Sequence, residues 1–307
     1  MAEQLYVLGH PVAHSMSPVM HNALYEALRL DWDYGLADRE DGEAAERFIA
    51  AREFLGCNVT MPYKPLALAQ ADIKAASAKL AGGANVLVSK EGTLIAYNVD
   101  GKGCVGFLEM RGVSFSEAKV VVCGTGPTSL AILHACAEAG AADIVLLGRD
   151  KGRTQACVNG YLEQYQELLS TAIPLPSAVE GHLGFAEAYE HATFRFGDYA
   201  GAHGAITQAD IIIDATPLGM QPTDPAPFDI SLLHEGQVVM DVVYGHGVSA
   251  LIKGAQAAGA RTFNGAGMLV CQAMDTDEIL FDIFGVDASL SRQEMFTLMA
   301  HAAGFDR

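Results

Sequence analysis

The residues with the clearest chemical potential lie around one lysine. Asn58 and Thr60 flank Val59 in a short apolar stretch, and Lys64 follows two residues after Pro62. If this stretch is a strand, its alternation places Asn58 and Thr60 on the face opposite Val59. Pro62 ends the strand and favours a turn that brings Lys64 to the same side. An amide, a hydroxyl and an ammonium group then converge, although a surface turn with a solvated lysine explains this segment alone equally well.

A carboxylate further along the chain is the partner that such a lysine needs for proton transfer. Asp100 closes an apolar run that forms a hairpin, across a glycine turn, with the run beginning at Val86. Its structural alternative is the N-cap of the next helix, because aspartate is a favoured capping residue. Beside Lys64, the carboxylate and the amine shift each other's proton affinity, which acid–base chemistry requires.

Two serines lie in the loop between the first predicted strand and the first predicted helix. Ser17 precedes Pro18, a pattern typical of an N-cap followed by proline at the first helical position, so capping alone accounts for Ser17. Ser15 has no such explanation. Together the two hydroxyls and the N–H groups of the helix start could receive a ligand carboxylate.

Composition and charge limit the classes of partner. The 307 residues, half of them hydrophobic and 18% charged, are enough for two folded domains. The net charge of −18 argues against nucleic-acid and anionic-membrane partners, while a small anionic substrate can still be held by local donors. Six scattered cysteines without a CxxC pair, and ten histidines without ligand spacing, indicate a reducing compartment and no metal site. No signal peptide or membrane-spanning stretch is visible, so we expect a cytoplasmic protein.

The hydrophobic periodicity predicts an α/β protein in which strands alternate with helices from about residue 104 onward. Strands are predicted at 4–8, 32–36, 55–60, 86–88, 93–100, 119–123, 143–147, 211–214 and 238–243. Helices are predicted at 17–28, 41–54, 64–80, 130–140, 153–169 and 249–259, with a final helical region after 265. The region from 150 to 209 is the least informative part of the chain.

A glycine turn between two apolar strands indicates a dinucleotide site. Gly124 and Gly126 allow a pyrophosphate to approach the following helix, while Pro127 and Ser129 replace the later small residues of the usual pattern. At the end of the next strand, Arg149 is placed for the 2′-phosphate of NADP. Asp150 favours the free ribose hydroxyls of NAD instead, so both cofactors stay possible and the balance leans to NADP.

Five segments, in matching order and spacing over nearly the whole chain, resemble the shikimate dehydrogenase family: 14–22, 56–64, 98–100, 215–220 and 268–273. The resemblance implies an α/β protein of two domains. A substrate domain over 1–103 is completed by 268–307, and a Rossmann-like NADP domain spans 104–267. The implied reaction is the reversible oxidation of shikimate to 3-dehydroshikimate, a step of aromatic amino-acid biosynthesis, with a cyclic hydroxy acid as the small-molecule partner. The sequence leaves a monomer and a homodimer equally open.

The resemblance also assigns roles to individual residues. Lys64 and Asp100 match the family's catalytic pair, and Ser15 and Ser17 match its carboxylate-binding serines. Further substrate contacts match Asn58, Thr60, Asn85, Tyr244 and Gln272, although Gln272 taken alone could be a plain helix-surface amide. The predicted cofactor-binding residues are Gly124, Gly126, Pro127, Thr128, Arg149, Asp150, Thr216, Gly219, Met220, Gly265 and Met268.

Departures from the family pattern leave the substrate open. Val86 and Val99 stand where the family usually has threonine, and each replacement removes a hydroxyl near the implied pocket, which alters discrimination between polyols. A paralogue acting on quinate or an amino analogue is therefore an alternative, with NAD or NADP. A non-catalytic dinucleotide-binding sensor is another, but it has no need for both Lys64 and Asp100.

Overall fold

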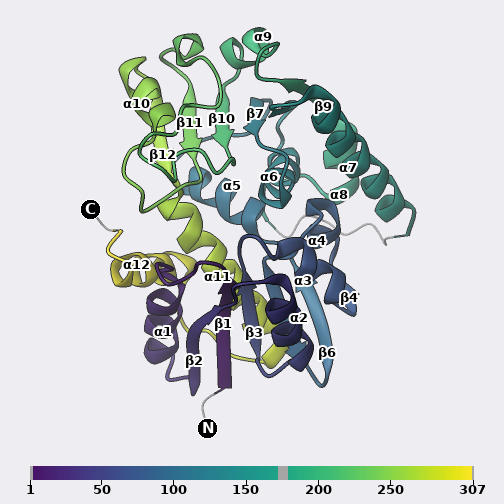
Figure 1. The fold of residues 1–307 in the computed structure, drawn as a ribbon, viewed down its shortest axis with the longest axis vertical. Helices are drawn as coiled ribbons and strands as arrows, with labels where there is room; N and C mark the ends of the chain where they lie inside the picture. Colours follow the sequence, from purple (N-terminus) through teal and green to yellow (C-terminus); the bar gives the residue numbers. More distant parts are fainter. Residues whose placement is uncertain (1–2, 172–178, 306–307) are drawn as a thin grey trace. The chain divides into compact units, whose positions relative to one another are not determined.

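The computed structural model describes residues 3–171 and 179–305. The chain divides into two compact units: Met1–Gly103 together with Leu269–Arg307, and Cys104–Met268. Each unit contains one six-stranded sheet with helices around it, so the predicted α/β class is confirmed (Figure 1). The chain passes from one unit to the other within helices α5 (Asp100–Met110) and α11 (Gly265–Phe284).

The sheet of the first unit has the strand order β2-β1-β3-β5-β6-β4. Its strands are β1 (Glu3–Gly9), β2 (Trp32–Asp38), β3 (Gly56–Val59), β4 (Ile73–Lys74), β5 (Val86–Lys90) and β6 (Thr93–Tyr97). Strand β1 is parallel to β2 and β3, whereas β5 is antiparallel to β3 and β6. The predicted hairpin is thus present as β5 and β6, although β6 ends three residues before Asp100.

The first unit also contains helices α1 (Ser17–Ala27), α2 (Gly42–Ala51), α3 (Lys64–Gln70), α4 (Ala76–Ala81) and α12 (Arg292–Ala302). Alternation along β3 assigns the two faces of the sheet. Cys57 and Val59 join an apolar core with residues of α2, α3 and α4. On the other face, a Cβ at Gly56 would lie 2.8 Å from Leu280 of α11. Asn58 points to this second face, where it meets α11.

The single helix predicted over 64–80 is wrong. Helix α3 ends at Gln70, and β4 then pairs in parallel with β6 before α4 begins. The backbone N–H of Asp72 donates to the carbonyl of Leu94, 2.9 Å away. Alanine-rich sequence favours a helix locally, but pairing with the sheet edge overrides that preference.

The sheet of the second unit has the order β12-β11-β10-β7-β8-β9, and all its neighbouring strands are parallel. Its strands are β7 (Lys119–Cys123), β8 (Asp143–Gly148), β9 (Thr193–Asp198), β10 (Ile211–Asp214), β11 (Val238–Asp241) and β12 (Arg261–Asn264). The chain reverses its direction across the sheet between β7 and β10. In open parallel sheets, ligands bind at the carboxyl ends of the strands at this reversal.

The helices of the second unit are α6 (Pro127–Glu138), α7 (Lys151–Thr171), α8 (Phe185–His191), α9 (His203–Thr207) and α10 (Ala250–Ala257), with a 3₁₀ turn η1 (Ile230–Leu232). The described residues between 150 and 209 form α7, α8, β9 and α9, and aromatic side chains of α7, α8 and β9 pack together. Tyr165 packs against Phe185 with ring centroids 4.4 Å apart. His134 Nδ1 and the Tyr161 hydroxyl share a hydrogen bond of 3.2 Å. Strands β9 and β12, both at sheet edges, were not predicted. Within the described ranges, no helix is both long and apolar enough to cross a membrane.

Candidate active site

The lysine and the aspartate singled out by the sequence form an ion pair in the first unit. Lys64 is the first residue of α3, Asp100 is the first residue of α5, and the Lys64 Nζ donates to Asp100 Oδ2. The two side chains are 13% and 7% exposed. Asn85 Nδ2 donates to the other carboxylate oxygen at 2.7 Å, so both oxygens of Asp100 are held.

The capping alternative does not account for the Asp100 carboxylate. Helix α5 begins at Asp100 itself, and the two carboxylate oxygens bond to the side chains of Lys64 and Asn85. The side-chain oxygen of Asn98 instead accepts the backbone N–H of Asp100 at 3.0 Å, while Asn98 Nδ2 donates to the carbonyl of Gly83 at 2.8 Å. Asn98 thus satisfies one backbone N–H at the start of α5, while the Asp100 carboxylate bonds to Lys64 and Asn85.

Asn85 connects the ion pair to the predicted amide of α11. Its side-chain oxygen accepts the backbone N–H of Val99 at 2.8 Å, which fixes the amide's orientation. Its Nδ2 group, besides contacting Asp100, lies 3.4 Å from Gln272 Oε1. Asn85 and Gln272 are 2% and 8% exposed, so Gln272 is not a plain helix-surface amide.

The two serines contact each other, and the capping prediction for Ser17 is wrong. Helix α1 begins at Ser17 itself, its N-cap is Met16, and no side chain caps it. Ser15 Oγ donates to Ser17 Oγ at 3.2 Å and accepts the backbone N–H of Ser17 at 3.3 Å. Because Pro18 follows within the helix rather than after a cap, the Ser17 hydroxyl has no capping duty and is 4% exposed.

Asn58 and Thr60 lie at the end of β3. Asn58 Oδ1 accepts a hydrogen bond from the Tyr34 hydroxyl at 2.8 Å, and Asn58 Nδ2 donates one to Thr276 Oγ1 at 2.9 Å. A Cβ on Gly9 would lie 2.4 Å from the Thr60 methyl carbon, so Thr60 packs against β1. Tyr34 and Thr276 were missed by the sequence analysis, since each looked like an ordinary residue of a strand or helix.

In the second unit, the predicted glycine turn follows β7. Gly124 has φ +114°, and a Cβ there would lie 2.5 Å from Ser129 Oγ and 3.0 Å from the Ala215 carbonyl oxygen. Gly126 is the N-cap of α6, and Pro127 occupies its first turn. Gly124 is thus required by the packing of the turn, whereas a Cβ on Gly126 would have no neighbour within 4 Å, so the start of α6, where Thr128 also lies, is open to close approach at Gly126.

A hollow beside this turn is lined by Thr125, Arg149, Asp150 and Arg153. Asp150 Oδ1 accepts the backbone N–H of Arg153 at 2.7 Å, the bond that an N-cap makes to the third residue of a helix. Capping α7 therefore explains Asp150 structurally. Among the described residues, neither Arg149 nor Arg153 forms an ion pair with a carboxylate, so both guanidinium groups can meet an anion.

The other predicted cofactor residues lie after β10 and at the start of α11. They are Thr216, Gly219, Met220, Gly265 and Met268. Gly219 has φ +102°, and a Cβ on Gly265 would lie 1.9 Å from the carbonyl oxygen of Val242, so neither position accepts a side chain. Tyr244 follows β11 in the same unit, where burial raises the pKa of its hydroxyl.

Two buried carboxylates at the ends of β10 and β11 were not predicted as a feature. Asp214 and Asp241 are register partners and are 1% and 2% exposed. The pKa of Asp214 is raised to about 7, chiefly by burial and also by the neighbouring Asp241, against the lowering effect of the hydrogen bonds from Thr216. Burial also raises the pKa of Asp241.

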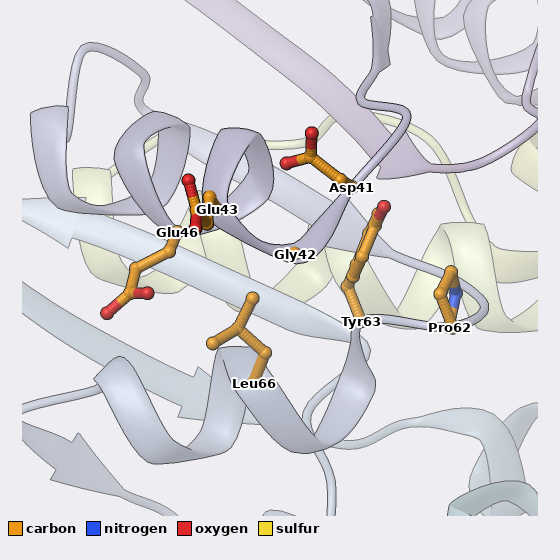
Figure 2. Close-up of a pocket in the computed structure, with 7 residues that line it drawn as sticks. All are labelled: Asp41, Gly42, Glu43, Glu46, Pro62, Tyr63 and Leu66. Carbon is orange, nitrogen blue, oxygen red and sulfur yellow. The ribbon is translucent and has the colours of Figure 1, made fainter.

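A second hollow, between the starts of α2 and α3 in the first unit, is acidic (Figure 2). It is lined by Asp41, Gly42, Glu43, Glu46, Pro62, Tyr63 and Leu66. Asp41 Oδ1 caps α2 by accepting the N–H of Ala44 at 2.7 Å, and the Tyr63 hydroxyl donates to the Arg39 carbonyl at 2.6 Å. Three carboxylates repel an anionic ligand, so this hollow does not fit the predicted carboxylate substrate. Within residues 3–171 and 179–305, no group of three or more His, Cys, Asp or Glu side chains could hold a metal ion.

Comparisons with known proteins point to one family. The family model for the shikimate dehydrogenase substrate binding domain matches residues 7–87. The shikimate dehydrogenase (NADP(+)) of Methanothermobacter thermautotrophicus is 33% identical over 277 residues, covering 89% of each chain. A crystal structure of a shikimate dehydrogenase in complex with NADP+ superposes with a TM-score of 0.78 at 27% identity, covering 98% of this chain and 94% of the other. Quinate dehydrogenase from Corynebacterium glutamicum in complex with NAD gives a TM-score of 0.75 at 25% identity, covering 98% and 99%. With this identity over most of both sequences, the chain belongs to the shikimate dehydrogenase family.

Proposed function

We propose that this protein is an NADP-dependent shikimate dehydrogenase that interconverts shikimate and 3-dehydroshikimate. The observation that carries the proposal is the Lys64–Asp100 ion pair, in which Asn85 holds the second carboxylate oxygen at 2.7 Å. Proton transfer needs a titratable group of fixed position, and this pair offers one in a mostly buried setting. The unit that contains it is the proposed substrate domain, and Cys104–Met268 is the proposed cofactor domain.

Lys64 exchanges the proton of the reacting hydroxyl. In the oxidising direction, its neutral amine accepts that proton while the carbon loses a hydride, and Asp100 stabilises the ammonium that forms. In the reducing direction, the ammonium returns the proton to the carbonyl oxygen. Because Asn85 and Lys64 hold both oxygens of Asp100, the carboxylate keeps its place through the cycle.

The substrate carboxylate is assigned to the two serines, and the ring hydroxyls to amide groups. Ser15 and Ser17 are in mutual contact at 3.2 Å, so two hydroxyl donors can reach one carboxylate. Such neutral donors suit a protein of net charge −18, which offers no general attraction for anions. Further contacts are proposed for Asn58, Thr60, Asn85, Gln272 and Tyr244.

The residues of the second unit fit a dinucleotide with a 2′-phosphate. When bound, NADP+ accepts the hydride at its nicotinamide ring. Gly124 permits the tight turn before α6, and Gly126 leaves room for the pyrophosphate at the start of this helix, where backbone N–H groups favour a negative charge. Arg149 is proposed to bind the 2′-phosphate, with Arg153 beside it, because capping of α7 already engages Asp150.

A quinate dehydrogenase is the second candidate, and two valines favour it. Val86 pairs in register with Asn58, and Val99 directly precedes Asp100. They are 0% and 5% exposed. Neither side chain offers the hydrogen bond that the family's usual threonine would, so the discrimination between cyclic hydroxy acids changes.

The test is the rate of nicotinamide reduction by the purified protein in four pairings: shikimate or quinate with NADP or NAD. The proposal expects the highest kcat/KM for shikimate with NADP. Highest activity with quinate supports the second candidate, and highest activity with NAD overturns the assignment of Arg149. If none of the four pairings gives turnover while NADP still binds, the catalytic proposal is refuted and a sensor becomes the better explanation.

A further inference from the structure

We propose that Tyr34 is a positioning residue that makes Asn58 an acceptor for a hydroxyl group of the substrate. The inference rests on the proposed function, since it takes Asn58 as a substrate contact. Tyr34 lies in β2, is 3% exposed and donates its hydroxyl hydrogen to Asn58 Oδ1 at 2.8 Å. Burial raises the pKa of Tyr34 well above its usual value, so the phenol keeps the proton that it donates.

The surroundings of Asn58 specify both ends of its amide group. Thr276 Oγ1 donates to the carbonyl of Gln272 at 2.9 Å, and a hydroxyl has one hydrogen, so toward Asn58 it can act only as an acceptor. Asn58 Nδ2 accordingly donates to Thr276 at 2.9 Å, and it also lies 3.4 Å from the Asn85 carbonyl oxygen. Both N–H groups of the amide are thus used inside the protein.

The oxygen of the same amide keeps one lone pair for a ligand. A carbonyl oxygen accepts two hydrogen bonds, and Tyr34 supplies one of them. Asn58 is 6% exposed, so removing the phenol leaves a buried carbonyl partly unsatisfied and free to reorient. With the phenol present, Asn58 offers a fixed acceptor to an O–H group and no donor to a carbonyl or carboxylate.

Tyr34 is itself held by α1 from two directions. The rings of His21 and Tyr34 are stacked, with centroids 4.2 Å apart and planes 3° apart. The Asn22 side chain donates to the Tyr34 carbonyl at 3.0 Å and accepts its N–H at 2.8 Å. Backbone and ring are therefore both fixed, and the phenol oxygen has little freedom to leave Asn58.

The support continues behind His21 into α11. His21 Nδ1 lies 2.9 Å from Asp277 Oδ2, and the Tyr25 hydroxyl donates to Asp277 Oδ1 at 2.7 Å. His21 and Asp277 are fully buried, and Tyr25 is 1% exposed. Tyr25 belongs to the same buried network as Tyr34 but is not bonded to Asn58, so it provides a matched control.

The test compares Tyr34→Phe with Tyr25→Phe in steady-state kinetics with shikimate and NADP. Loss of one neutral hydrogen bond corresponds to about 5- to 10-fold. We expect Tyr34→Phe to raise the KM for shikimate by about that factor, with kcat and the KM for NADP changed less than about 2-fold. Tyr25→Phe should lower the melting temperature and leave all three constants within about 2-fold. Equal increases of KM in both variants would mean general loosening of the fold and would overturn the proposal.

A double-mutant cycle locates the effect. In an Asn58→Ala background, Tyr34→Phe should raise the KM by less than about 2-fold, because its target is already gone. Full additivity would show that Tyr34 acts elsewhere and refute the proposal, and so would an unchanged KM in Tyr34→Phe alone. If Asn58→Ala does not fold, Asn58→Leu takes its place in the cycle, because Tyr34 also interacts with the Ser17 side chain and only a cycle at position 58 assigns the change in KM to Asn58. A parent protein that neither binds nor oxidises shikimate refutes the proposed function, which is distinct from an active parent whose Tyr34→Phe variant keeps its KM.

Discussion

In the first unit the candidate site consists of side chains that hold one another, whereas in the second it consists of backbone turns and exposed arginines. Lys64, Asp100 and Asn85 are linked by direct hydrogen bonds. Around Gly124 and Gly265, by contrast, the important property is the missing side chain. The site of the first unit should lose catalysis when one of its functional groups is removed. The site of the second unit should lose cofactor binding when an arginine is removed or when a side chain replaces a glycine hydrogen.

The largest expected effect tests the side-chain site. Lys64→Met should lower kcat by about 10³-fold, since loss of a positioned acid–base group typically costs 10²- to 10⁴-fold. NADP affinity, measured by fluorescence titration, should stay unchanged because the cofactor residues lie in the other unit. Lys102→Met is the control, because Lys102 is also paired with a buried carboxylate, Asp275, at 3.0 Å. A comparable loss of kcat in Lys102→Met would show that any lysine–carboxylate pair of this unit matters equally.

The next effect is a dependence of stability on pH, which arises from Asp214 in the parallel sheet of the second unit. Burial raises the pKa of Asp214 from 3.8 to about 7. This carboxyl loses its proton near pH 4 in the unfolded chain and only near pH 7 in the folded chain, so its contribution to stability is fully present below pH 4 and is lost as the pH rises through 7. Full loss corresponds to roughly 4 kcal/mol. Asp241, Cys123 and Tyr199 are the titratable groups around this carboxylate.

Asp214→Asn removes the titrating group and keeps a carbonyl oxygen for the Thr216 N–H, 2.9 Å away. Urea unfolding at pH 5 and pH 8 should show the variant gaining stability over the parent as the pH rises. The buried amide itself changes stability equally at both pH values, so the dependence on pH, and not the absolute value, is diagnostic. Parallel pH profiles for parent and variant would contradict the raised pKa.

The third effect tests the anion partner of the backbone site. Arg149→Gln should raise the KM for NADP by about 10- to 100-fold, because charge-assisted hydrogen bonds are worth about 1.5 to 3 kcal/mol. The KM for NAD, which has no 2′-phosphate, should change less than about 2-fold. Lys151→Gln is the control, since Lys151 is the exposed first residue of α7, two positions after Arg149, but does not line the hollow. Equal losses for NADP and NAD would show that Arg149 does not read the 2′-phosphate.

The sequence predicted well those features that depend on neighbouring residues. Apolar runs gave β7, β8, β10 and β11 because strands buried on both faces are continuously hydrophobic. The ion pair was predicted from Lys64 and Asp100, two charged residues that follow predicted strands and that each begin a helix in the structure. Two predictions from local sequence were wrong. Ser17 is the first residue of α1 and not its N-cap, and the helix predicted over 64–80 ends at Gln70.

The features that were missed depend on partners far apart in the chain. Tyr34 contacts Asn58 and stacks on His21, and Thr276 reaches Asn58 across 218 positions of sequence. No local pattern marks such a tyrosine, because alternation assigns it only to a strand. The role of Asp150 was ambiguous for the same reason, since its capping bond to the N–H of Arg153 is a property of the folded turn.

The smallest expected effect separates the candidate site from the acidic hollow of Figure 2. Asp41→Ala should lower the free energy of unfolding by about 1 kcal/mol, because its carboxylate caps α2 through the N–H of Ala44. Asp41→Ser keeps a capping oxygen and should lose only a fraction of that. Since the hollow repels anions, kcat and the KM for shikimate should stay within about 2-fold in both variants, as measured beside urea unfolding. A change of KM in Asp41→Ser, which retains the cap but lacks the charge, would mean that the field of this hollow reaches the nearby Lys64 and that the ion pair is not electrostatically isolated.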